Sequence, residues 1–288
     1  MKIHSIIFIF ISVLISSCKQ SEPSQPSIMV TIEPLRYFAE TIVGDNFKVI
    51  SMVPKGSSPE TYDPTPQQLM TFSKSSAYFQ IGYIGFELAW MNKLTANAPE
   101  LPVFDTSKGI NLIYAEEHKH GDHSHGGIEP HIWNSIPNAK LIAKNILEGI
   151  LSIDNENTEF YTENYNLLIQ EIDAVEKEID SLFSQNDVNQ GFMIYHPALS
   201  YFAKDYGLKQ ISIEEEGKEP TPGHMKKLIN ACFEENIHII FIQPEFDIKN
   251  AEVIAEQTKS IIVPINPLSY NWKEEMLNTA KALIIKAN

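Results

Sequence analysis

Short apolar runs rich in β-branched residues alternate with segments of helical periodicity along most of the chain. The apolar runs predict strands over residues 28–32, 47–53, 77–81, 192–195, 209–213, 239–242 and 261–265. The periodic segments predict helices over residues 34–43, 86–96, 138–151, 222–236, 249–258 and 272–286. Strands that alternate with helices are typical of α/β units built on parallel sheets. The pattern therefore predicts an α/β fold in which parallel sheets are flanked by helices.

One helical segment, residues 155–184, is longer and more highly charged than the others. Its apolar stripe consists of Leu167, Leu168, Ile172, Val175, Ile179 and Leu182. A stripe of this length suits a rigid helix that joins two lobes better than a crossover helix within one sheet. We therefore expect an N-terminal lobe over 28–154, a linking helix over 155–184 and a C-terminal lobe over 185–288.

The first residues have the pattern of an export signal. Lys2 supplies a positive charge, and residues 6–15 form an almost unbroken apolar run that is too short to span a bilayer comfortably. The run ends in Ile-Ser-Ser-Cys, which resembles the bacterial lipobox, so Cys18 is the predicted site of lipidation after removal of residues 1–17. The polar, proline-rich residues 18–27 suit a tether. We expect an exported, membrane-anchored lipoprotein facing the periplasm or the cell exterior; the alternative is an ordinary signal peptide with an incidental cysteine.

The composition narrows the classes of partner. The chain has 37 acidic and 22 basic side chains, a net charge of −15, and 43% apolar residues. This acidity argues against nucleic-acid binding, because phosphate recognition needs clustered Lys and Arg. The apolar content is ample for one or two packed domains. Cys232 lies in a predicted helix, where we expect a buried structural thiol.

Four predicted strands are each followed by a polar residue and then a proline. The polar residues are Glu33, His196, Gln243 and Asn266. Proline cannot donate to the ladder and keeps the preceding residue extended, so these side chains are expected at the carboxyl ends of parallel strands. Ligands bind at that edge of open α/β sheets. Strand termination explains any single case, but three cases in the C-terminal half favour a binding site.

Two histidines and a glutamate in separate loops are candidate metal ligands. His131 lies in the segment I-E-P-H-I-W, His196 follows the strand 192–195, and Glu60 lies in a proline-rich loop before a helix near 66–74. Two imidazoles and a carboxylate suit Zn²⁺, and also Mn²⁺ or Fe²⁺. Their spacing alone is weak evidence, because a histidine at a strand end is more often simply hydrogen-bonded.

Several segments in a fixed order together resemble the zinc/manganese solute-binding proteins of ABC transporters. They are V-P-K-G-S-S-P-E-T-Y-D-P-T-P (53–66), E-P-H-I-W (129–133), H-P-A-L-S-Y-F-A-K-D-Y-G-L (196–208) and E-P-T-P-G-H-M-K-K-L (219–228). The similarity runs from about residue 28 to residue 285, and the motifs are specific jointly rather than singly. The resemblance implies two α/β lobes joined by a rigid helix, with one metal ion bound in the cleft between them.

The resemblance also implies a ligand set, with two departures. Family members usually carry histidine in the first loop, within S-P-H-x-(Y/F)-E-P, where this chain has Glu60. His131 and His196 match the second and third ligands. The fourth is usually an acidic residue before Pro-Leu, and here it is the neutral Asn266. Alternative fourth ligands in the same lobe are Gln243 and Glu245.

A histidine cluster bears on the identity of the metal. Segment 116–126 contains four histidines: His118, His120, His123 and His125. Neutral imidazoles bind Zn²⁺ well and Mn²⁺ poorly, and the segment resembles the His-rich loop of zinc-binding family members. We expect an auxiliary zinc site here, and the alternative is a solvated insertion without a role.

The expected function is that of a binding protein rather than an enzyme. We expect a monomer that captures Zn²⁺ in the cleft and delivers it to the membrane permease of an ABC importer with its ATPase. The same role for Mn²⁺ or Fe²⁺ is one alternative. Others are a metal-carrying adhesin and a metal-dependent enzyme, although the chain has no H-E-x-x-H motif and no obvious paired general base.

Overall fold

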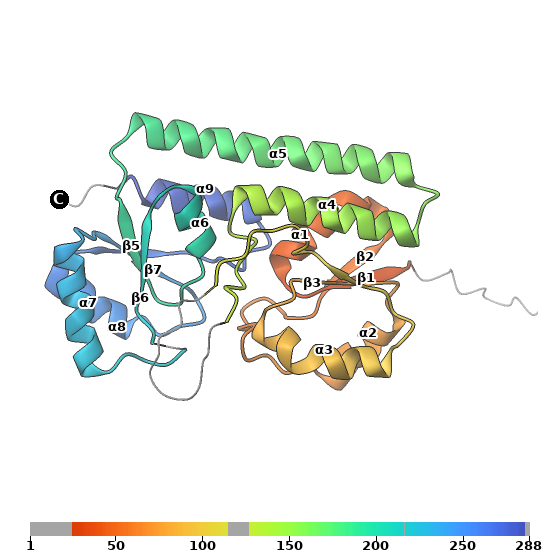
Figure 1. Cartoon of the computed structure of the whole chain (residues 1–288), viewed down its shortest axis with the longest axis horizontal. Coiled ribbons are helices and arrows are strands. Elements are labelled where there is room, and N and C mark those ends of the chain that lie inside the picture. The colour runs from red at the N-terminus through yellow and green to blue at the C-terminus, as the bar shows by residue number, and fades with distance from the viewer. Residues whose placement is uncertain (1–24, 115–126, 216, 286–288) are drawn as a thin grey trace, which may run out of the picture.

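Two parallel four-stranded sheets form the centres of two lobes, and helix α5 (Thr158–Gln185) runs alongside both of them (Figure 1). This is a computed structural model, and it describes residues 25–114, 127–215 and 217–285. The predicted α/β fold, with two lobes and one long connecting helix, is confirmed.

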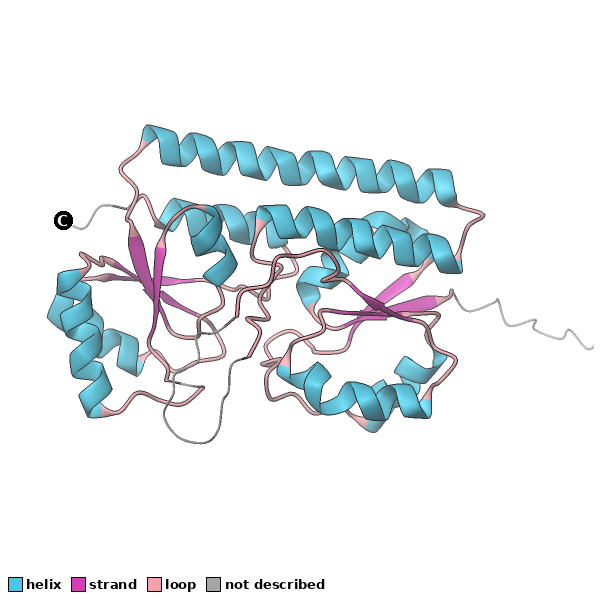
Figure 2. Ribbon diagram, in the orientation of Figure 1, coloured by secondary structure: helices cyan, strands magenta, loops and turns pink. Residues whose placement is uncertain are grey.

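The sheet of the N-terminal lobe has the strand order β2-β1-β3-β4, and all its neighbouring strands are parallel. Its strands are β1 (Ser27–Val30), β2 (Lys48–Ser51), β3 (Tyr78–Gln80) and β4 (Val103–Asp105). Its helices are α1 (Glu33–Val43), the 3-10 turn η1 (Gly44–Asn46), α2 (Pro66–Lys74), α3 (Gly85–Asn97) and α4 (Ile136–Ile153). Helices α1 and α4 cover one face of this sheet, and α2 and α3 cover the other (Figure 2).

The sheet of the C-terminal lobe has the order β6-β5-β7-β8 and is also parallel throughout. Its strands are β5 (Gly191–Ile194), β6 (Lys209–Ser212), β7 (Ile239–Ile242) and β8 (Ile261–Pro264). Its helices are α6 (Ser200–Asp205), α7 (Pro222–Glu234), α8 (Lys249–Thr258) and α9 (Trp272–Ala282). In both sheets the first strand along the chain pairs with the second on one side and the third on the other. The lobes therefore share one topology.

Three short elements lie outside the sequence prediction: η1, β4 and α6. Strand β4 has three residues and helix α6 has six, so neither is long enough to show a period.

The apolar stripe of α5 differs from the prediction at Leu167, which is 53% exposed. The buried stripe is Leu168, Ile172, Val175 and Ile179. These positions follow the 4-3-4 spacing of one helix face, and Leu167 lies one residue, or about 100°, away from it.

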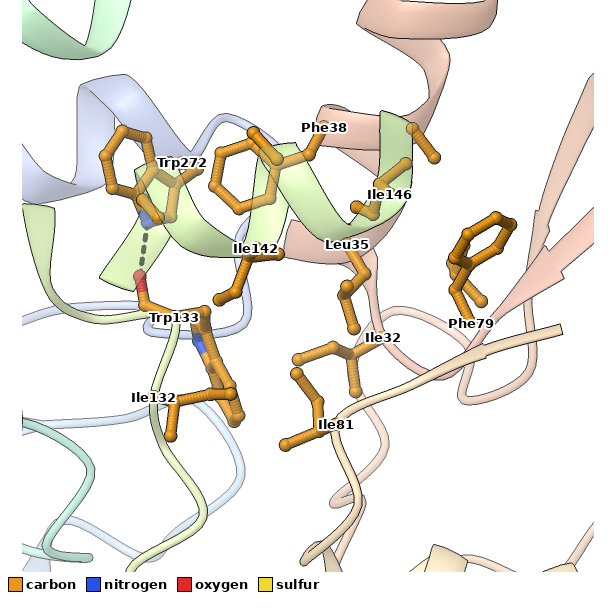
Figure 3. Close-up of a cluster of buried hydrophobic side chains, with 14 of the residues drawn as sticks. Ile32, Leu35, Phe38, Phe79, Ile81, Ile132, Trp133, Ile142, Ile146 and Trp272 are labelled. Atoms are coloured by element: carbon orange, nitrogen blue, oxygen red, sulfur yellow. Dashed lines mark hydrogen bonds between the residues drawn. The ribbon is translucent and has the colours of Figure 1, made fainter. Parts of the chain in front are cut away.

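A continuous hydrophobic core crosses from one lobe into the other (Figure 3). It includes Phe38 and Phe79 of the first lobe together with Trp272 of the second. The Trp272 indole N–H donates to the carbonyl of Trp133 at 2.7 Å (Figure 3), and the Trp133 indole N–H donates to the carbonyl of Pro267 at 2.7 Å. Both tryptophans are buried, and α5 packs against α1, α4 and α9, so hydrogen bonds and a shared core join the two lobes.

A second, smaller core lies within the C-terminal lobe and contains Cys232. The thiol is buried as predicted, and burial raises its pKa.

Within the described part of the chain, every helix is either too short or too polar to cross a bilayer. The predicted signal peptide and Cys18 lie outside the described residues, as do His118, His120, His123 and His125, so these assignments stay predictions.

Candidate metal centre

Three side chains that are far apart in the sequence bring possible metal-binding atoms together between the lobes. One such atom each from Glu60, His131 and His196 lies within 4.8 Å of the others. The residues come from the loop after β2, the segment before α4 and the loop after β5. They border a cavity of about 30 Å³, which has room for an ion. His131 is 5% exposed, and the His196 side chain is 20% exposed.

Glu60 is held by the start of helix α3. The Gly85 N–H donates to Glu60 Oε2 at 3.1 Å, and the Phe86 N–H donates to the carbonyl of Pro59 at 2.9 Å. The first N–H groups of a helix have no partner within the helix, so the loop satisfies donors that α3 would otherwise leave free. The other oxygen, Glu60 Oε1, is buried without a hydrogen-bond partner. This oxygen is therefore available to a cation.

A buried carboxylate fixes the position of α3. Glu87 accepts hydrogen bonds from the backbone N–H groups of Ile81 and Gly82 after β3 and from the hydroxyl of Thr31 after β1. Burial raises the pKa of Glu87 to about 7. Glu87 thus ties α3 to the carboxyl ends of two strands, and α3 in turn holds the loop that carries Glu60.

The His131 ring is oriented by a neighbouring carboxylate. Its Nδ1 lies 2.5 Å from Glu129 Oε1, and its backbone N–H donates to the same oxygen at 2.9 Å. The Ser200 hydroxyl of the other lobe donates to Glu129 Oε2 at 3.1 Å. Burial alone lowers the pKa of His131, but Glu129, together with Glu60 and Glu214, outweighs burial and raises this pKa above its ordinary value. The same pairing outweighs burial at Glu129 and lowers the pKa of its carboxyl.

The His196 ring is oriented in the same way within the second lobe. Its Nδ1 lies 2.8 Å from Glu214 Oε1, and Glu214 is 8% exposed. The Phe246 ring stacks on the imidazole with centroids 5.5 Å apart and planes inclined by 18°. The Gln243 amide donates from Nε2 to the His196 carbonyl at 2.6 Å and accepts the His196 N–H at Oε1, at 3.3 Å. Both the ring and the backbone of His196 are therefore fixed.

These contacts determine which ring nitrogens face the cavity. An ionised carboxylate only accepts hydrogen bonds, so each imidazole donates from Nδ1, and in the neutral ring Nε2 then carries a lone pair. The Nε2 atoms of His131 and His196 lie 3.1 Å apart. Two lone pairs at this separation repel each other unless a proton or a metal ion lies between them. Carboxylates behind metal-binding histidines also raise the basicity of the ligand nitrogen.

The other residues that the sequence suggested as metal ligands lie in different surroundings. Glu245 and Gln243 line the same cavity as the two histidines. Asn266 lines a neighbouring hollow instead, and its Oδ1 accepts the N–H of Leu268 at 3.1 Å. Glu33, which also follows a strand, is the first residue of α1 and does not line this cavity. Its carboxylate forms an ion pair with Arg36 at 2.7 Å.

Several residues that shape the centre are not among the candidates predicted from the sequence. Glu214 directly follows the predicted strand 209–213, so the strand-end argument that found His196 could also have found it. Gly85 and Phe246 carry no such signal. Their importance comes from contacts with Glu60 and His196 that only the folded chain brings about.

Two lobes with imidazoles and a carboxylate converging between them define a class: binding proteins that hold a small cation in an interlobe cleft. Comparison with known proteins then identifies the family. Residues 28–283 match the model of the ZnuA family, described as the periplasmic zinc-uptake complex component A. The chain belongs to this family, so it is a substrate-binding protein of a metal ABC transporter. Its membership confirms the predicted resemblance, and it also confirms that the chain is a binding protein rather than an enzyme.

Individual relatives agree with this assignment. The chain is 26% identical over 275 residues to the manganese ABC transporter substrate-binding lipoprotein PsaA of Streptococcus anginosus, and the match covers 89% of this chain and 86% of that one. A crystal structure of ZnuA superposes with a TM-score of 0.81 at 32% identity, covering 89% of this chain and 96% of that one. A zinc-bound deletion mutant of ZnuA has a TM-score of 0.81 at 31% identity, covering 91% of this chain and 99% of that one.

Proposed function

We propose that this protein captures a single Zn²⁺ ion between its lobes and delivers it to the permease of an ABC importer with its ATPase. The ligands are Glu60 Oε1, His131 Nε2 and His196 Nε2. The observation that carries the proposal is the separation of 3.1 Å between the two Nε2 atoms. Tetrahedral zinc with bonds of about 2.0–2.1 Å places two nitrogens roughly 3.3 Å apart. A shift of a few tenths of an ångström therefore converts the observed pair into a zinc-binding pair.

The donor types favour Zn²⁺ over Mn²⁺. Imidazole nitrogen is a good ligand for zinc, whereas manganese prefers carboxylate, carbonyl and water oxygens. A site with nitrogen and oxygen ligands also binds zinc more tightly than manganese. The Streptococcus anginosus relative is named for manganese, and one ZnuA relative is a zinc-bound protein. The metal must therefore be determined in direct competition between the two ions.

Capture by this site would connect the lobes without a large closing motion. Glu60 and His131 belong to the first lobe, His196 belongs to the second, and one ion contacts all three. The hydrogen bonds that join Trp133 to Pro267 and to Trp272 and the continuous core oppose rotation of one lobe against the other. We infer that metal binding causes only a small, local shift of the ligand loops, and that the permease recognises the metal-bound state.

The N-terminal sequence supports a location at the membrane. We propose an exported, monomeric lipoprotein whose lipid on Cys18 holds it at the membrane that contains the permease. The histidines of segment 116–126 would provide a weaker, auxiliary zinc site beside the tight one. Deletion of residues 116–126 should therefore remove weak zinc binding and leave the tight site nearly intact in isothermal titration calorimetry.

A metal-competition experiment tests the main proposal. The protein, stripped of metal, is titrated with Zn²⁺ and with Mn²⁺ in the presence of a chelator of known affinity, alongside Glu60→Ala and His196→Ala. We expect one tight zinc site per chain, weaker manganese binding, and a loss of more than about tenfold in zinc affinity for each variant. Tighter binding of manganese than zinc would overturn the choice of metal, and unchanged affinity in both variants would overturn the ligand assignment.

A further inference from the structure

Three side chains of the C-terminal lobe could complete the coordination of an ion held by Glu60, His131 and His196. They are Gln243, Glu245 and Asn266. Four-coordinate geometry is usual for zinc, so the hydrogen bonds that each candidate already makes decide which of them is free to bind.

Asn266 is occupied within its own turn. Its Oδ1 accepts the N–H of Leu268 at 3.1 Å, and its N–H donates to Glu275 Oε1 at 2.7 Å. Its side chain is also neutral and does not line the cavity between the histidines. Binding a metal through this amide would break the turn and add no negative charge.

Gln243 is occupied on both sides of its amide. Nε2 donates to the carbonyl of His196 at 2.6 Å, and Oε1 accepts the N–H of His196. Gln243 is only 3% exposed, and withdrawing its oxygen would leave the N–H of His196 without this partner. This residue positions His196 and is not free to bind the ion.

Glu245 is the candidate with a free donor atom. Its Oε1 is buried and has no hydrogen-bond partner, and the same is true of Glu60 Oε1. Both residues line the cavity between the histidines. Among the described residues only three buried side-chain polar atoms lack a partner, and two of them belong to these glutamates. A buried carboxylate oxygen without a donor is unfavourable, and a cation is the group that would satisfy it.

The turn that carries Glu245 is fixed to His196. The Phe246 N–H donates to the carbonyl of Gln243 at 3.2 Å, so residues 243–246 form a closed turn. The Phe246 ring stacks on His196 and on Tyr195, with centroids 4.9 Å apart in the second pair. Glu245 is not among the side chains whose donor atoms lie within 4.8 Å of each other, so its carboxylate must swing toward the ion by rotation about its own side-chain bonds.

We infer that Glu245 is the fourth ligand of the bound ion. This inference rests on the proposed function and deepens it. With Glu60 and Glu245 ionised and both imidazoles neutral, the ligands carry two negative charges and neutralise a divalent cation. The site would then consist of two nitrogens and two carboxylate oxygens, and Glu245 would close it after the ion has entered between Glu60 and the histidines.

The test uses Glu245→Gln, which keeps the size of the side chain and removes its charge. The matched control is Glu256→Gln, which makes the same charge change on the exposed surface of α8 in the same lobe. Zinc affinity is measured by titration against a competing chelator, and Co²⁺ is used as a spectroscopic substitute. The visible absorption of Co²⁺ is strong in four-coordinate sites and weak in six-coordinate sites. Thermal unfolding of the metal-free variants shows whether each one is folded.

We expect Glu245→Gln to weaken zinc binding by at least about tenfold and to change the Co²⁺ spectrum, with Glu256→Gln matching the parent protein in both. Wild-type affinity and an unchanged Co²⁺ spectrum in Glu245→Gln would overturn the inference, and so would a loss of affinity confined to an Asn266→Ala variant. Either result would leave the proposed function intact if Glu60→Ala still loses affinity. Absence of tight zinc binding in the parent protein would instead overturn the proposed function itself.

Discussion

Gly85, the first residue of α3, lies against the loop that carries Glu60 and leaves no space for a side chain. A Cβ at this position would lie 2.4 Å from the Glu60 carbonyl oxygen and 2.8 Å from its Oε2. Cβ contacts below 3.0 Å are essentially never observed, so in Gly85→Ala the carbonyl must retreat by at least 0.6 Å, the difference between 3.0 and 2.4 Å. Alanine is otherwise favourable in a helix, so the substitution acts through this contact.

A displacement of this size is enough to impair metal binding. Ligands must be held within about 0.5 Å of their productive geometry, and the hydrogen bond from Gly85 to Glu60 Oε2 would be lengthened as well. We therefore expect Gly85→Ala to weaken zinc binding about 10- to 100-fold, which corresponds to about 1.4–2.7 kcal/mol. The assay is calorimetric titration of zinc at constant pH with a competing chelator.

The matched control for this experiment is Gly223→Ala. Gly223 lies in the first turn of α7, and a Cβ there would meet nothing within 4 Å. This variant should bind zinc like the parent protein. If Gly85→Ala binds zinc as tightly as Gly223→Ala, the position of the Glu60 loop does not matter for the site, and the reasoning is refuted.

Three further predictions concern the contacts around the centre and between the lobes. Glu214→Ala removes the acceptor that holds Nδ1 of His196, so zinc affinity should fall about 10- to 100-fold in the same titration; an unchanged affinity would contradict this role. Trp272→Phe leaves the buried carbonyl of Trp133 without its donor, and urea unfolding should show a loss of about 1–3 kcal/mol; equal unfolding free energies would contradict it. Glu87 has a pKa of about 7 in the folded state, whereas its pKa in the unfolded chain is near the ordinary value of 4.3. The Glu87 carboxyl therefore stays protonated to a higher pH in the folded protein than in the unfolded chain. Its contribution to the unfolding free energy should therefore fall by about 3 kcal/mol as the pH rises from about 4.5 to 7 and level off above that range. Urea unfolding at several pH values should show this decline in the parent protein relative to Glu87→Gln, and parallel pH profiles would argue against it.

The fold was predictable because its hydrophobic pattern is local. A buried parallel strand is a short apolar run, and a covering helix shows a 3.6-residue period, so most elements can be read from single segments. The error at Leu167 shows the limit of this reading, because neighbouring leucines differ by about 100° around a helix. Only the packing of α5 against α1, α4 and α9 decides which of the two is buried.

The metal centre was only partly predictable. His131 and His196 stand out because they lie in recognisable motifs, and Glu60 occupies a motif position. The end of a predicted strand marks Glu214 as a candidate, but its pairing with His196 could not be assigned from spacing, since the two lie 18 residues apart in the sequence. The choice among possible fourth ligands depends on which side-chain oxygens are already hydrogen-bonded, and that is a property of the folded chain.

We propose above that one divalent ion binds between the lobes to Glu60, His131 and His196. Crystals of the zinc-loaded protein, measured on both sides of the zinc absorption edge, test it most directly. We expect a single strong anomalous peak between the two Nε2 atoms and Glu60 Oε1, with bonds of about 2.0–2.2 Å. At one equivalent of zinc, a peak at another position, or no peak in this cleft, would show that these residues do not form the metal site.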